Sequence, residues 1–285
     1  MWISDKWNDY ELLDCSDGEK LERWGKYVLI RPEPQAIWKT PREHDGWKNF
    51  DARYERSKSG GGSWSINSLP EKWQISYSAD EKLTFNVSLM NFKHTGLFPE
   101  QAVNWEYIIN KIKTANRKIN VLNLFAYSGG ATLAAALAGA AVCHVDASKG
   151  MVARARENAA LSALEEKPIR WIVDDCTAFI QREMRRGRKY DVIIMDPPSF
   201  GRGPSGEVWK LESSLYDFVE LCVGVLSDDP LFVLINSYTT GLSPSTLSYI
   251  AQSALGGKAE SRELGLSVMS RSLALPCGAT CRLEF

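Results

Sequence analysis

The second part of the chain alternates short apolar runs with helical stretches, and this pattern constrains the fold more than any other feature. The predicted strands are 119–124, 141–146, 169–173, 191–195 and 231–235. The predicted helices are 130–137, 149–161, 177–186 and 208–226. Parallel strands need such crossovers, which cover both faces of a sheet, and runs that are apolar throughout suit strands buried on both faces. The sequence therefore predicts a doubly wound, Rossmann-like parallel α/β sheet.

Residues 1–95 differ in composition and pattern from the rest. Seven of the ten tryptophans lie there, together with alternating runs at 73–77 and 83–89 that are typical of short, half-buried strands. Ser57–Ser63 is rich in glycine and serine and is predicted to be a flexible loop. We therefore expect a small, Trp-rich β domain at 1–95, a connecting helix within 96–117 and the α/β domain at 118–285.

The bulk composition excludes several classes of protein. A net charge of −1 means that contact with nucleic acid would need a local patch. The polar start and the absence of an apolar run of about 18 residues predict no leader, no membrane span and a cytoplasmic protein. Six scattered cysteines suggest reduced thiols, and Cys277 with Cys281 lacks the further ligands of a zinc site, so we expect no metal.

Turn and acidic residues follow three successive predicted strands. Ligands of open α/β sheets lie outside the carboxyl ends of the strands. The first turn, Phe125–Gly130, has small residues that let a ligand approach the backbone, although a plain strand-to-helix turn would look similar. Asp146 is placed to accept both ribose hydroxyls, or to cap the next helix, a role that Ser148 could also serve. Asp174 and Asp175 are placed to accept the adenine amino group, with helix capping as the alternative.

The most specific motif is Asp196-Pro-Pro-Ser-Phe200, after the fourth predicted strand. The prolines fix the backbone and remove two N–H donors, which leaves carbonyl oxygens as acceptors. An amino group or ring N–H would be held by Asp196 and the Pro197 carbonyl, beside Pro198, and Phe200 is suited to stack on a base. This corner would aim a nitrogen lone pair at a methyl sulfonium. Together with the acids, it indicates S-adenosylmethionine-dependent methyl transfer.

From about Asn91 onward the chain resembles the class I methyltransferases of large-subunit ribosomal RNA, the bacterial 23S rRNA cytosine-C5 and guanine-N7 enzymes. The resemblance rests on 122–130, 145–148, 174–175 and 196–200, on 93–101, which is similar to a segment against the cofactor, and on 275–280, which is similar to the final strand. It implies a seven-stranded sheet that binds S-adenosylmethionine. The implied cofactor residues are Gln101, Asn123, Phe125, Tyr127, Ser128, Gly129, Asp146, Ala147, Asp174, Asp175 and Asp196. Asp196 and Pro197 are the implied catalytic residues, and Pro198, Phe200 and Tyr238 the implied substrate contacts.

Two departures from the family pattern narrow the chemistry. The family segment ends Asp-Gln-Arg, whereas this chain has Glu100-Gln101-Ala102. Cytosine-C5 enzymes carry a cysteine after the fifth strand, but Asn236–Gly241 contains none. Transfer to C5 needs a thiolate that adds to the ring, and neither Cys176 nor Cys222 is an obvious replacement. We therefore expect ribosomal RNA as partner and a base nitrogen as the target atom.

Other functions stay open at this point. A protein amide or a small molecule would also suit the Asp196 corner, and the fold could bind its cofactor without transferring a methyl group. A nicotinamide oxidoreductase is disfavoured because the G-x-G-x-x-G motif is missing. Two basic regions could meet phosphates: Arg182–Lys189, which could equally be a solvated helix end, and a set of cations interleaved with aromatic rings. That set comprises Lys39, Arg42, Lys48, Arg53, Arg56 and Lys58 with Trp38, Trp47 and Tyr54.

Overall fold

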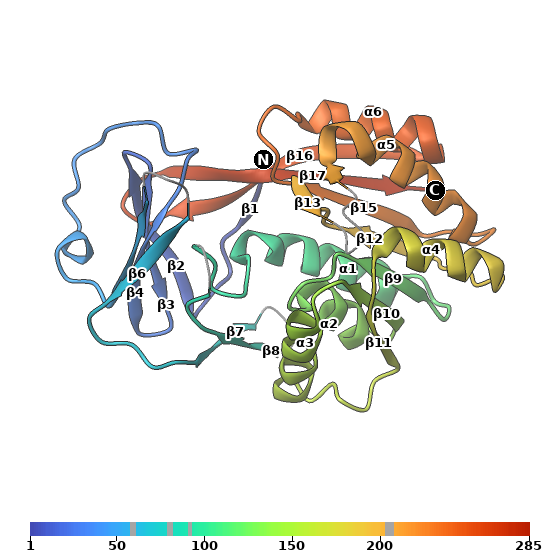
Figure 1. Ribbon diagram of the computed structural model, residues 1–285, viewed down its shortest axis with the longest axis horizontal. Coiled ribbons are helices and arrows are strands. Elements are labelled where there is room, and N and C mark those ends of the chain that lie inside the picture. The colour runs from blue at the N-terminus through green and yellow to red at the C-terminus, as the bar shows by residue number, and fades with distance from the viewer. Residues whose placement is uncertain (58–60, 79–81, 91–92, 203–207) are drawn as a thin grey trace. The chain divides into compact units, whose positions relative to one another are not determined.

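The computed structural model describes residues 1–57, 61–78, 82–90, 93–202 and 208–285. They form two compact units: Met1–Val103 with Gly265–Cys277, and Asn104–Leu264 with Gly278–Phe285. This division differs from the expected boundaries after residues 95 and 117. The reason is that two long strands near the C-terminus, β16 (Lys258–Val268) and β17 (Leu273–Glu284), contribute residues to both units (Figure 1). Residues 58–60 of the expected flexible loop, and Lys58 with them, lie outside the described residues.

The first unit is rich in strands, as its alternating sequence predicts. Its main sheet has the order β2-β3-β4-β5-β6, and β7 and β8 form a separate antiparallel hairpin. Trp24 and Phe85 are fully buried, and the rings of Tyr10 and Trp24 meet edge to face at 4.9 Å. The strands are β1 (Trp2–Ser4), β2 (Tyr10–Ser16), β3 (Glu19–Trp24), β4 (Tyr27–Pro32), β5 (Ala52–Arg56), β6 (Gly62–Ile66), β7 (Trp73–Ser78) and β8 (Lys82–Val87), with 3₁₀ turns η1 (Asp45–Trp47) and η2 (Pro99–Gln101).

The proposed stacking surface of this unit does not form. Trp47 is 9% and Tyr54 only 4% exposed, so neither ring offers a face on which a base could stack. The Trp47 indole donates to Asp14 at 2.9 Å. Arg42 and Arg53 both pair with Glu19 at 2.8 Å. Trp47 and Tyr54 are therefore core residues of this unit, whereas Trp38 is half-buried.

The second unit carries the predicted doubly wound sheet. Its strands follow the order β11-β10-β9-β12-β15-β17-β16, and β17 runs antiparallel to β15. The first five in this order are parallel to one another. Their bounds are β9 (Asn120–Leu124), β10 (Ala141–Asp146), β11 (Ile169–Val173), β12 (Val192–Met195) and β15 (Phe232–Ser237). This is the seven-stranded architecture that the sequence predicts.

Helices cover both faces of this sheet. One face packs against α4 (Cys176–Arg185), α5 (Leu211–Cys222) and α6 (Pro244–Leu255), and the shared core includes Leu122, Val145 and Ile193. Helices α2 (Gly130–Leu137) and α3 (Lys149–Leu161) pack on β10, and α1 (Ala102–Thr114) lies against β15 through Tyr107 and Phe232, whose rings are 5.1 Å apart (Figure 1). No helix among the described residues is long and apolar enough to cross a membrane.

One predicted helix is wrong at its start. Val208–Lys210 forms β14, which pairs with β13 (Phe200–Arg202), and α5 begins only at Leu211. A single 3₁₀ turn, η3 (Val223–Val225), follows its end at Cys222. The pairing with Phe200–Arg202 is a strand–strand interaction, which helical periodicity cannot reveal.

Candidate functional site

The strand register brings the predicted site residues of the second unit to one edge of the sheet. Leu124 is paired with both Val145 and Met195, and Asp146 with Val173. The residues that follow these strands therefore lie side by side at their carboxyl ends. The chain runs outward from β9 through β10 to β11 and then returns to β12 on the other side of β9. Ligands of open α/β sheets bind at such a reversal of strand order.

The turn after β9 has an unusual backbone. Phe125 and Tyr127 have φ of +53° and +48°, and Gly129 has φ of +91°. Left-handed conformations are costly for residues with a side chain and persist only where the surroundings hold them. Here the Ala126 N–H donates to the Val145 carbonyl at 3.0 Å, which ties the turn to β10. Such strained turns cluster at ligand sites.

The two glycines of this turn allow close helix packing. A β-carbon on Gly129 would lie 2.9 Å from Cβ of Ala155 in α3. A β-carbon on Gly130 would lie 2.5 Å from Cζ2 of the buried Trp105 in α1. The glycines are therefore required by neighbouring helices, in addition to any approach of a ligand to the turn.

Asp146 is held in place by backbone donors on both oxygens. The N–H groups of Tyr127 and Ser148 donate to its carboxylate, each at 2.8 Å. Burial raises the pKa of Asp146, and these two backbone hydrogen bonds partly oppose that rise. Ser148 caps α3 by accepting from the Met151 N–H, so the capping role belongs to Ser148 and not to Asp146. A fixed carboxylate at this strand end fits a pair of ribose hydroxyls.

The two acids after β11 have different partners. Asp175 caps α4 and accepts the Ala178 N–H at 2.9 Å. Asp174 forms an ion pair with Arg182, and its N–H donates to the Asp146 carbonyl at 3.1 Å. The capping alternative therefore describes Asp175, and an adenine contact by either residue stays a prediction.

The other predicted cofactor residues lie in varied surroundings. Asn123 is buried and donates to Thr132 at 2.8 Å, and the Ser128 carbonyl accepts from Asn158 at 2.9 Å. Ala147 is exposed beyond β10. Gln101 is buried in η2, which belongs to the first unit, so the structure does not bring it into the unit that holds the turn.

His144 and His94 are not suited to acid–base catalysis. His144 Nδ1 lies 2.9 Å from the Thr132 hydroxyl, and burial lowers the pKa of His144 to about 3. His94, in the first unit, has its pKa lowered to about 4, chiefly by burial and then by nearby cations such as Arg31. Both rings are therefore neutral at ordinary pH, which suits core positions.

The Asp196 corner is fixed at three points. The Pro198 carbonyl accepts from the Trp209 indole at 2.6 Å. The Ser199 carbonyl accepts from the Leu211 N–H at 3.1 Å, where α5 begins, and the Thr239 hydroxyl donates to the Ser199 hydroxyl at 2.7 Å. These hydrogen bonds restrain Pro198 and Ser199. The backbone that follows the Asp196 carboxylate is therefore held in place.

Aromatic rings surround this corner. The ring of Phe125 lies 5.6 Å from Trp209 and 5.3 Å from Phe218, and Trp209 meets Phe218 edge-on at 5.6 Å. Phe200 is 55% exposed, which leaves its ring available to a substrate. Tyr238, after β15, is half-buried against Gly278, where a β-carbon would lie 2.9 Å from its Cδ1 atom.

Sequence analysis missed two parts of this site. Trp209 was placed in a helix, although an indole shortly after a proline corner could have signalled a hydrogen bond to it. Asn104 was missed as well: it donates to Asn236 at 3.1 Å and to Thr280 at 3.3 Å, and accepts from Arg282 at 2.9 Å. This network connects α1, the end of β15 and β17.

None of the cysteines is activated. All six are free, and the pKa of each is raised by burial. Cys176 lies nearest the turn and accepts from the Phe125 N–H at 3.4 Å, which does not offset its burial. A nucleophilic cysteine needs a lowered pKa. No group of His, Cys, Asp or Glu suited to a metal ion occurs among the described residues.

The fold and the strand-end turn together define a Rossmann-like α/β domain with groups suited to a nucleotide-type cofactor at its strand ends. Its family follows from comparison with known proteins. The model of the S-adenosylmethionine-dependent methyltransferase family matches residues 47–229, well over half of the chain, which therefore belongs to that family. Its cofactor is S-adenosylmethionine, for which Asp146 and the turn at Phe125–Gly129 provide a fitting set of groups.

A solved structure similar over the whole chain is that of a SAM-dependent methyltransferase from Agrobacterium tumefaciens. It is 38% identical, with a TM-score of 0.92 over 99% of this chain and 92% of that one. The ribosomal RNA large subunit methyltransferase K/L of Shewanella frigidimarina is 31% identical over 54% of this chain and 21% of its own length. The protein of the same name from Colwellia psychrerythraea is 29% identical over 62% of this chain and 22% of its own. The chain thus spans about a fifth of the length of these curated relatives.

Proposed function

We propose that this methyltransferase modifies a base nitrogen of large-subunit ribosomal RNA in the cytoplasm. The observation that carries the proposal is the Asp196-Pro-Pro-Ser-Phe200 corner, next to the cofactor turn at the reversal of strand order. The names of the relatives with matching segments support RNA as the acceptor. The buried, unactivated cysteines support nitrogen over carbon, because addition to a pyrimidine ring needs a thiolate.

Each residue of the site has a defined task in this scheme. When bound, S-adenosylmethionine supplies a methyl carbon whose bond to sulfur breaks as the bond to nitrogen forms, with the electron pair left on sulfur. Asp196 accepts an N–H of the base, which orients the nitrogen lone pair, and can take up the proton that the nitrogen loses. Phe200 stacks on the base. Positioning in line supplies most of the rate, since a small misplacement costs about 100-fold.

The test compares Asp196→Ala and Asp196→Asn with the wild type. Both variants should lose transfer by at least about 100-fold, because the base nitrogen is no longer oriented. Asp196→Ala should keep most of its affinity for S-adenosylhomocysteine, measured by calorimetry. Asp228→Asn is the control, since Asp228 is exposed in a loop before β15. Weak cofactor binding with normal turnover in Asp196→Ala would contradict the assignment.

The acceptor is tested separately. Ribosomal RNA from cells that lack the protein is mapped by mass spectrometry, and one N-methylated base should be missing and return with the wild-type gene. An unchanged modification profile would exclude RNA and favour a protein amide or a small molecule. Loss of a C5-methyl group would refute transfer to nitrogen.

A further inference from the structure

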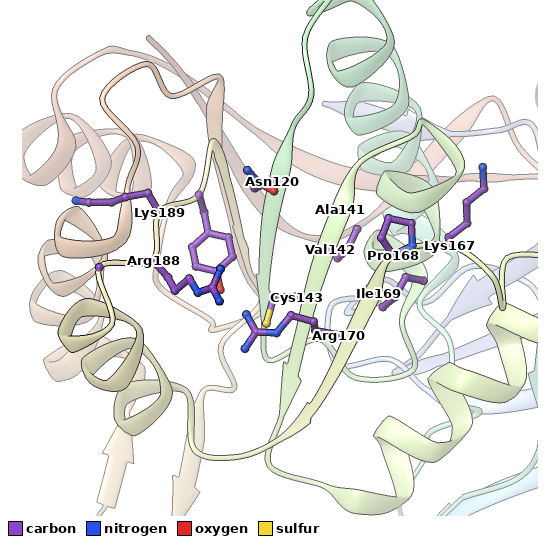
Figure 2. A pocket seen from close by; sticks show the side chains of 12 residues that line it. Asn120, Ala141, Val142, Cys143, Lys167, Pro168, Ile169, Arg170, Arg188 and Lys189 are labelled. Carbon is purple, nitrogen blue, oxygen red and sulfur yellow. The ribbon is translucent and has the colours of Figure 1, made fainter.

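A cavity lies at the opposite edge of the second unit's sheet from the Asp196 corner. Its volume is about 540 Å³, and twelve residues line it. Asn120, Ala141 and Ile169 are the first residues of three neighbouring strands, β9, β10 and β11. The turn Gly187–Tyr190, between α4 and β12, forms another wall (Figure 2). The cavity is therefore at the amino-terminal ends of the strands and is separate from the cofactor site.

The cavity wall carries only positive charge. Lys167, Arg170, Arg188 and Lys189 line it, and none of the twelve lining residues is acidic. In Figure 2, Arg170 and Arg188 extend toward the middle of the cavity, whereas Lys167 and Lys189 lie on its two sides with their amino ends pointing outward. Glu183 is fully buried behind the wall and accepts from the Tyr190 hydroxyl at 2.6 Å and from Arg170 at 3.2 Å. Of the four cations of the wall, Arg170 is thus paired with this buried carboxylate.

A solvated helix end does not explain this cluster. Cations near the C-terminus of α4 favour its dipole, and Arg182 and Arg185 in its last turn serve that purpose. Lys167 and Arg170 come from another part of the chain, before and within β11. Over the described ranges, the side chains of Lys167 and Arg188 are exposed and have no protein partner, whereas Lys189 donates to the Gly224 carbonyl at 3.2 Å. Lys167 and Arg188 are therefore two cations of the cavity lining that are available to an anion.

We propose that this cavity binds phosphate groups of the RNA that the enzyme methylates. The inference rests on the proposed function for the presence of RNA. Arginine guanidinium groups match phosphate oxygens in pairs, and lysines add point charge. Strand β10 has six residues, so about 20 Å of sheet separates the cavity from the cofactor edge. A folded RNA domain spans that distance, so one RNA contacts both edges: the cavity holds backbone, and the Asp196 corner holds the base.

The test compares a variant that lacks two cations of the cavity wall with a control variant that lacks two cations elsewhere. The cavity variant is Lys167→Gln with Arg188→Gln. The matched control is Arg185→Gln with Lys258→Gln, which makes the same charge change at exposed positions outside the cavity. Binding of protein-free large-subunit ribosomal RNA is measured without cofactor over a series of salt concentrations. Thermal unfolding shows that each variant is folded.

We expect RNA binding to depend less on salt concentration in the cavity variant than in the wild type. Each phosphate contact contributes roughly 0.7–0.9 to the slope of log affinity against log salt, so the cavity variant should lose about 1 to 2 units of slope. Its affinity at low salt should fall about tenfold, and the KM for RNA should rise with kcat unchanged. The control should keep the wild-type slope.

Three outcomes would overturn the inference. The slope could be unchanged in the cavity variant, or it could fall equally in the control, which would indicate only general charge. Inorganic phosphate or a mononucleotide could bind the wild type but not the cavity variant while the RNA slope stays the same, which would assign the site to a small anion. Wild-type protein that binds RNA with the expected slope change but methylates none would refute the proposed function and leave the cavity result standing.

Discussion

Asp146 combines two demands that oppose each other. A carboxylate that accepts ribose hydroxyls must be ionised, yet burial beside the turn raises its pKa. The N–H groups of Tyr127 and Ser148 partly compensate, since both donate to the ionised form. The balance leaves this aspartate protonated at a higher pH than an exposed one.

We therefore expect Asp146 to set the acid limit of cofactor binding. Affinity for S-adenosylhomocysteine should fall as the pH falls through the raised pKa of Asp146, above the ordinary aspartate value of about 3.9. The Asp146→Asn variant should bind S-adenosylhomocysteine more weakly by about 1.5–3 kcal/mol, because hydrogen bonds to a charged acceptor are lost. Its affinity should also be flat across the acid range. Calorimetry over that range measures both effects, and a wild-type affinity that stays constant below the ordinary value would refute this role.

Gly130 illustrates how a motif glycine can serve packing. Gly130→Ala should destabilise the protein by roughly 1–3 kcal/mol, since the added methyl group would overlap the ring of buried Trp105. Gly150→Ala is the control, because a β-carbon there meets nothing closer than 3.9 Å. Urea unfolding measures the difference. Equal stability of the two variants would show that α1 can move away from the turn.

At the scale of elements, Glu183 connects α4 to the sheet and to the cavity wall. It is fully buried, and besides Tyr190 and Arg170 it accepts from Arg186 at 3.0 Å. Burial alone would raise its pKa, but the hydrogen bonds from Tyr190, Arg186 and Arg170 lower it. The stabilisation is therefore present above the ordinary glutamate pKa and is lost as the pH falls through the lowered one.

Glu183→Gln should lose this stabilisation. We expect the free energy of unfolding to fall by about 1–3 kcal/mol at neutral pH, because the buried carboxylate that accepts these hydrogen bonds is replaced by a neutral amide. The deficit relative to wild type should shrink as the pH falls below the glutamate range. Urea unfolding at neutral and acid pH tests this, with exposed Glu220→Gln as the control. A deficit that is independent of pH would indicate lost packing and not lost charge.

The elements differ in how far the sequence could predict them. Strands β10 and β11 and helices α2 and α3 have the predicted bounds, because glycine, serine and aspartate mark their ends. The acids at the strand ends and the Asp196 corner could be predicted in the same way, from residues that mark the ends of strands. The hairpin of β13 and β14 and the contacts of Trp209 depend on pairing between segments, which local periodicity does not encode. The burial of Trp47 and Tyr54 likewise depends on how the whole first unit packs.

At the scale of the whole molecule, cofactor binding should raise stability by mass action. With S-adenosylhomocysteine at about 100 times its Kd, the second unit should gain about 2.7 kcal/mol. Its unfolding midpoint should rise by roughly 5–10 °C. Differential scanning calorimetry measures the shift, with NADH as the control ligand. An equal shift with NADH, or no shift with S-adenosylhomocysteine in a protein that binds it, would contradict the assignment of the site.

The two strands that contribute to both units also determine when each unit can complete its fold during synthesis. The first unit contains Met1–Val103, yet it also needs Gly265–Cys277, which includes Val268 paired with Leu12 of β2. A ribosome that synthesises about 5–20 residues per second delivers that segment long after Val103. The first unit therefore stays incomplete until Gly265–Cys277 has emerged, and the second unit likewise lacks its β17 strand until then. The same stretch of chain completes both units, so a chain interrupted before residue 265 leaves both of them unfinished.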